Sequence, residues 1–77
     1  MEILHWDPFY VPAHLERAIL FAREARWPDV IGEAAFVTRN ADDTTMLRTA
    51  HSFLARAFHG ASQDRKARTE ELWIEAH

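Results

Sequence analysis

Five histidines are the side chains in this sequence with the most varied chemistry, and they are spread along the chain at His5, His14, His51, His59 and His77. A protein zinc site needs three or four ligands in tetrahedral geometry, and such sites usually include a closely spaced pair. No two of these histidines have that spacing, and the Glu-x-x-His motif of di-iron bundles occurs only at 2–5, ahead of the expected helices. The sequence therefore predicts no metal site and no cofactor, with the histidines on or near the surface.

Nucleophilic catalysis is the second chemistry to consider. The chain has no cysteine and no Gly-x-Ser-x-Gly motif, and its two glycines are too far apart to form a phosphate-binding loop. The segment 50–52, Ala-His-Ser, resembles the start of the histidine-phosphotransfer signature, in which lysine and glycine follow the histidine by three and four positions. Leu54 and Ala55 stand at those positions instead, and His51 and Ser52 are helical neighbours that do not face each other. We therefore expect a protein that is not an enzyme.

Basic residues in the C-terminal half offer nucleic-acid binding as an alternative. The candidate contacts, on the expected third helix and the start of the fourth, are Arg48, Ser52, Arg56, Arg65, Lys66 and Arg68. A short helix followed by a turn and a longer helix also loosely matches a helix-turn-helix. However, the formal net charge is -3, and Asp42 and Asp43 lie where a recognition helix would approach phosphates. Nucleic acid is therefore the less favoured partner.

Apolar residues that recur with a period of 3.6 predict the helices that carry these side chains. The expected helices cover 13–26, a segment beginning at 27, a segment that follows a turn at 40–44 and is closed by Gly60, and a segment beginning at 62. Within the second of these, residues 35–38 are also compatible with a short strand, although a helix is favoured. No internal repeat is evident. The predicted fold class is all-α, a small three- to four-helix bundle, orthogonal or up-and-down, formed by one domain over residues 1–77.

Prolines, glycines and capping residues mark the ends of these helices. Pro12 suits the first turn of the first helix, Gly60 is expected to close the third as a left-handed C-cap, and Ser62 is expected to cap the fourth. Oppositely charged residues four positions apart are expected to pair along the fourth helix, Asp64 with Arg68 and Lys66 with Glu70. Residues 6–12 contain three aromatics and two prolines, which predicts an extended strap across the bundle.

Length and composition set further limits. A chain of 77 residues with 48% hydrophobic side chains has room for one core and is not expected to be disordered. The absence of cysteine is compatible with a reducing compartment, and no stretch approaches the ~20 apolar residues that span a bilayer. We therefore expect a cytoplasmic protein with no membrane contact.

The chain has more large apolar residues than one small core needs. The candidate partner-binding residues are Trp6, Leu20, Phe36, Leu72, Trp73 and Ile74. Leu20 lies among the polar positions of the first helix, and the last three are consecutive, so at least one of them must point outward. Trp73 is expected to be that residue, because tryptophan is common among interface anchors. The alternative is that the strap and the last helix complete the core around these residues.

A non-catalytic protein-binding module is the function that these observations favour, in the form of a small regulator or inhibitor that docks on a larger protein. Compact, acidic, cysteine-free proteins without an active site resemble phage-encoded inhibitors of host machinery, such as anti-CRISPR proteins. A self-associating adaptor or homodimer would use the same apolar surface. Nucleic-acid binding through Arg48 and Arg56 is the remaining alternative.

Overall fold

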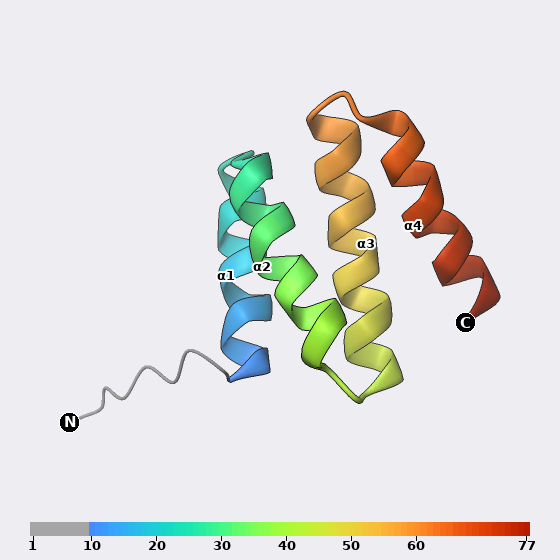
Figure 1. The fold of residues 1–77 in the computed structure, drawn as a ribbon. Coiled ribbons are helices and arrows are strands. Elements are labelled where there is room, and N and C mark those ends of the chain that lie inside the picture. The colour runs from blue at the N-terminus through green and yellow to red at the C-terminus, as the bar shows by residue number, and fades with distance from the viewer. Residues whose placement is uncertain (1–9) are drawn as a thin grey trace.

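Four helices make up the part of the chain that the computed structural model describes, residues 10–77 (Figure 1). They are α1 Val11–Arg23, α2 Trp27–Asn40, α3 Thr44–Gly60 and α4 Asp64–Ala76. These residues contain no strand, so the all-α prediction is confirmed and 35–38 is helical. Residues 6–9 of the expected strap lie outside the described residues. Val11, which was expected to be extended, already belongs to α1, and Pro12 lies in the first turn of α1 as predicted.

Local capping explains where most of the helices begin. A proline lies in the first turn of both α1 and α2, where its missing N–H removes no hydrogen bond. At α3, the Asp43 carboxylate accepts a hydrogen bond from the Thr45 backbone N–H at 2.8 Å. The prediction that Ser62 caps α4 is wrong. Gln63 is the N-cap residue and makes no side-chain cap hydrogen bond, while Ser62 has a left-handed backbone with φ 63°.

Gly60 does not have the left-handed role that its position suggests. It is the last residue of α3 and has no positive φ. A Cβ atom at Gly60 would lie 2.3 Å from Cε2 of the Trp27 indole, so the glycine is needed because α2 approaches α3 closely there. Within residues 10–77, the left-handed residues are instead Ala25 and Ser62. The first helix ends at Arg23, two residues before Ala25 and three residues before the predicted end.

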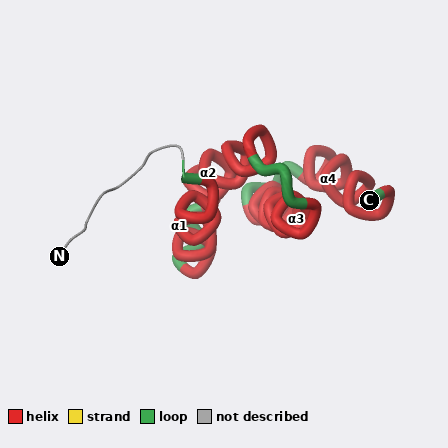
Figure 2. Tube along the Cα trace, turned by 90° about the horizontal axis from the view of Figure 1, so that it is seen from below, coloured by secondary structure: helices red, strands yellow, loops and turns green. Residues whose placement is uncertain are grey.

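The helices alternate in direction and form a row in which each one packs against the next (Figure 1). Viewed from below, α1 and α3 lie on one side of the row and α2 and α4 on the other, and α1 also contacts α3 (Figure 2). Val30 and Val37 are the largest fully buried side chains, and most of the other core residues are alanines. Small side chains let the helix backbones approach closely, which suits an up-and-down arrangement.

The second helical hairpin repeats the first at an offset of 37 residues, so the expectation of no internal repeat is wrong. The two turns have matching backbones: φ/ψ are -97°/4° at Glu24 and -92°/9° at Ala61, and the next residues, Ala25 and Ser62, have φ 56° and 63°. Matching hydrogen bonds also close them, from Arg26 N to Phe21 O and from Gln63 N to Phe58 O. Residues 10–77 therefore form a tandem of two helical hairpins, α1–α2 and α3–α4.

Candidate protein-binding surface

Each hairpin is held together by a histidine, a glutamate and an aromatic ring. In the first, His14 Nδ1 lies 2.6 Å from Glu33 Oε1, and the imidazole stacks on Phe36 with 3.9 Å between ring centroids. The second hairpin has the same arrangement 37 residues later, formed by His51, Glu70 and Trp73. Because a carboxylate accepts and the imidazole donates, these contacts tie the first helix of each hairpin to the second. The two aromatic rings, Phe36 and Trp73, were predicted to bind a partner, but each of them stacks on a histidine of this protein.

The exposure of the three consecutive apolar residues of α4 differs from the prediction for Leu72, Trp73 and Ile74. Trp73 stacks on both His51 and His77, with centroid distances of 3.9 and 4.1 Å, and is half-buried. Ile74 is also half-buried. Leu72 is the outward-pointing residue, with 49% of its surface exposed. The expected orientation of Trp73 is therefore wrong, because the His51 ring on α3 offers the indole a stacking partner that sequence spacing does not reveal.

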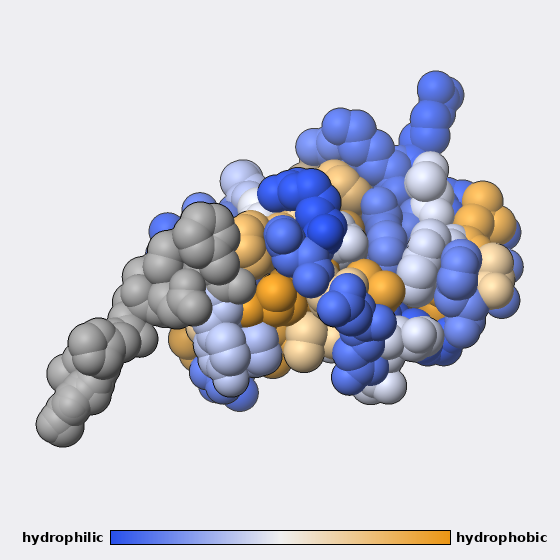
Figure 3. Space-filling view, turned by 60° about the horizontal axis from the view of Figure 1, so that its bottom comes forward, coloured by the Kyte–Doolittle hydropathy of each residue, from blue (hydrophilic) through white to orange (hydrophobic). Residues whose placement is uncertain are grey.

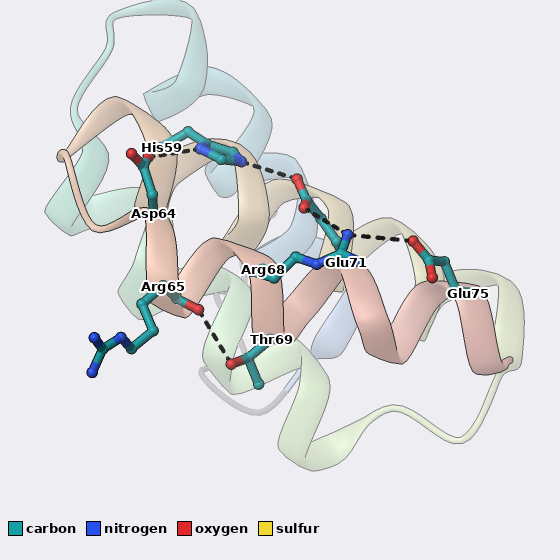
Figure 4. A network of polar contacts seen from close by, with 7 residues as sticks. All are labelled: His59, Asp64, Arg65, Arg68, Thr69, Glu71 and Glu75. Carbon is teal, nitrogen blue, oxygen red and sulfur yellow. Dashed lines mark hydrogen bonds and ion pairs between the residues drawn. The ribbon is translucent and has the colours of Figure 1, made fainter.

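The outer edge of α4 carries a connected set of charged side chains (Figure 4). Nδ1 of His59 lies 2.9 Å from a carboxylate oxygen of Asp64, and Nε2 lies 2.9 Å from a carboxylate oxygen of Glu71. Arg68 then lies 3.7 Å from Glu71 and 3.6 Å from Glu75. Hydrogen bonds from His59 to Glu71 first, and then to Asp64, raise the pKa of His59 above its ordinary value of 6.5. We call this set the α4 ion network.

The predicted pairs four residues apart on α4 are replaced by contacts with α3. Asp64 contacts His59 rather than Arg68, and Glu70 contacts His51 rather than Lys66. Arg68 pairs instead with carboxylates further along its own helix. Glu70 contacts His51, whose ring is held beside α4 by stacking on Trp73, whereas an exposed pair on one helix contributes only about 0.2–0.5 kcal/mol.

The positions of the α4 ion network correspond to a mostly apolar contact surface in the first hairpin, 37 residues earlier in the chain. Its members His59, Asp64, Arg68, Glu71 and Glu75 correspond to Ala22, Trp27, Ile31, Ala34 and Thr38. In the first hairpin, Ala22, Trp27 and Ile31 pack with Ala57 of the second hairpin. The same positions in the second hairpin are charged and satisfy one another. In a row of stacked helical units, a polar outer face of this kind closes the end of the row.

The candidate nucleic-acid residues do not form one basic surface. Arg48 donates to the backbone oxygen of Ile74 at 3.3 Å, and Arg68 is held by carboxylates of the α4 ion network. Ser52 and Arg56 line a shallow open hollow on α3 with Thr49 and Phe53. Arg65 and Lys66 are exposed on α4, where Asp64 is their neighbour. Acidic groups are thus interleaved with the basic ones, which weakens attraction for phosphates.

The outer edge of α1 differs from that of α4. Tyr10, the N-cap residue of α1, and Leu20 are 57% and 54% exposed. Their counterparts 37 residues later are Leu47, which is half-buried, and Ala57, which is fully buried. Figure 3 shows apolar surface in separate patches with hydrophilic side chains between them. We call the side of α1 that carries Tyr10, Ala13, Arg17 and Leu20 the α1 edge. The sequence pattern placed Tyr10 in the N-terminal strap and not at the start of α1, because the first helix was expected to begin at residue 13.

The predicted partner-binding residues are therefore not brought together. Leu20 lies on the α1 edge and Leu72 on α4, while Phe36, Trp73 and Ile74 are half-buried. Trp6 lies outside the described residues.

Residues 10–77 contain no group of three or more His, Cys, Asp or Glu side chains placed to hold a metal ion. None of the helices in that part of the chain is long and apolar enough to cross a membrane. Comparison of the chain with protein-family models, with curated proteins and with solved structures found no match.

Proposed function

We propose that this protein is a non-catalytic protein-binding module that contacts its partner through the α1 edge. The observation that carries the proposal is a difference in exposure between two residues that occupy the same position in the two hairpins. Leu20 is 54% exposed, whereas Ala57, 37 residues later, is fully buried against α2. A large apolar side chain at a position that is otherwise covered by a neighbouring helix marks a site for a further helix or a similar apolar surface.

Charge favours a protein over a nucleic acid as the partner. The chain has twelve acidic and nine basic residues, and the basic residues near α4 are mixed with carboxylates. The α1 edge carries both signs, with Glu16 and Arg17 side by side on the exposed side of the helix. Such a surface gives no long-range attraction for a phosphate backbone. A regulator or inhibitor that docks on a larger protein and a self-associating adaptor would both use this edge.

Site-specific photocrosslinking tests this proposal. A photoreactive side chain replaces Leu20 in one variant and Leu72, the matched exposed leucine on α4, in the other. Irradiation of cells that produce the full chain should yield a covalent product with a protein, either this chain or another, from position 20 and not from position 72. No product from position 20, or products with nucleic acid alone, would contradict the proposal.

A further inference from the structure

The α1 edge has the pattern of a surface that is covered elsewhere in the same chain. Ala57 packs with Val30 and Trp27 of α2, and on the same side of α3 Ala50 is fully buried and Leu54 is 5% exposed. The positions that correspond across the repeat are Tyr10 with Leu47, Ala13 with Ala50, Arg17 with Leu54, and Leu20 with Ala57. The α1 edge is thus a copy of the stripe that α3 buries, but without a helix packed on it in the described residues.

We infer that a second copy of this chain covers the α1 edge, with the two α1 helices packed antiparallel about a twofold axis. This inference rests on the proposed protein-binding function and names the partner. The opposite edge of the row ends in the α4 ion network, whose charges already satisfy one another. Within residues 10–77, the α1 edge is therefore the edge of the row that carries large exposed apolar residues with no further helix packed on them. When a second copy binds at this edge, each copy contributes the same surface patch to the interface. A dimer formed in this way has no such edge left for a third copy.

The side chains of the α1 edge fit such a twofold axis in one register. When the axis lies midway between positions 13 and 17, Tyr10 faces the partner's Leu20 and Ala13 faces the partner's Arg17. Each large apolar residue then meets another, and the methyl group of Ala13 leaves room for the long arginine. Centring the axis on Arg17 would place two guanidinium groups together, which is unfavourable. Arg17 also donates to Glu33 at 3.1 Å, which holds it toward α2.

The expected dimer is weak, because the interface is small. A helix of 13 residues is about 20 Å long, and one face of it buries less than the ~800 Å² per partner of a standard interface. We therefore expect a dissociation constant on the order of 10–100 μM. Because so small an interface contains few apolar contacts, removing either Tyr10 or Leu20 should weaken the dimer at least tenfold.

Sedimentation equilibrium of the full chain tests the inference over a range of about 5–500 μM. Leu20→Glu is compared with Leu72→Glu, which places the same charge on the equally exposed leucine of α4. The parent and Leu72→Glu should approach twice the chain mass at high concentration, and Leu20→Glu should remain monomeric. Tyr10→Ser is a second edge variant that introduces no charge, and it should also weaken the dimer. Circular dichroism establishes that each variant is folded.

Three outcomes would overturn the dimer. They are a parent that stays monomeric throughout the range, dissociation caused by Leu72→Glu but not by Leu20→Glu, and equal dimerisation of all folded variants. A monomeric parent whose position 20 crosslinks to a different protein would retain the protein-binding function and remove only the second copy. Loss of both the crosslink and the dimer would remove the proposed function as well.

Discussion

Gly60→Ala should destabilise this protein, although alanine is the better helix former. The Cβ atom of the variant would lie 2.3, 2.5 and 2.8 Å from three atoms of the Trp27 indole. Those atoms belong to one rigid ring packed between helices, so relief requires movement of the whole side chain or of α2. Overpacking of this kind costs about 1–3 kcal/mol, and the helix-propensity gain of at most about 1 kcal/mol is smaller still at a terminal position. We expect a net loss of about 1–2 kcal/mol.

Gly32→Ala provides the matched control. Gly32 lies inside α2, is exposed, and has no atom within 4 Å of an added Cβ. Its replacement should therefore stabilise the fold by about 0.5–1 kcal/mol. Urea unfolding followed by circular dichroism measures both variants. In a Trp27→Ala background, the cost of Gly60→Ala should disappear. Equal stabilisation by the two glycine replacements, or an undiminished cost without the indole, would refute the close approach of Trp27 to α3.

Four further predictions concern individual side chains and metal. Because the pKa of His59 is raised, its protonated form stabilises the folded state below its ordinary value of 6.5, and this contribution is lost as pH rises through the raised pKa. The melting temperature should thus fall more between about pH 6 and pH 8.5 in the parent than in His59→Gln; equal slopes would exclude the effect. Leu54→Ala, at a residue 5% exposed, should cost roughly 2–5 kcal/mol in urea unfolding, and a cost below about 1 kcal/mol would show that the α3 stripe is not core. Trp73→Ala should lower the melting temperature while leaving any partner affinity unchanged, because its ring packs on His51; a tenfold loss of affinity would reverse that assignment. Chelators should leave thermal melts unchanged, and stoichiometric metal in the purified protein would contradict this.

Helix locations follow from local signals, and those were predictable. Pro28 and Asp43 mark the starts of α2 and α3 because first-turn prolines and N-cap carboxylates act within a few residues. The apolar period of α3 likewise identifies Ala50, Leu54 and Ala57 as core. Such features depend on the backbone close to each residue, so one sequence is enough to predict them.

Features that depend on contacts between helices were not predictable in the same way. Gly60 looked like a left-handed cap, but its role is set by Trp27, which is distant in sequence. The repeat was invisible because only five residues of the first hairpin recur 37 positions later: Ala13, His14, Ala18, Phe21 and Glu33. What the two hairpins share is backbone geometry and burial, which many side chains satisfy. The α1 edge became recognisable only when it was compared with the covered stripe of α3.

Concentration-dependent amide chemical shifts of the full chain test most directly whether the α1 edge is the binding surface. In a dilution series recorded by NMR, we expect the amides of Ala13, Arg17 and Leu20 to shift with concentration, because they lie on the edge that a second copy covers. The amides of Arg68, Leu72 and Glu75, beside the α4 ion network, should not move. Shifts confined to α4, or spectra that do not change over the concentrations at which sedimentation detects association, would contradict binding through the α1 edge.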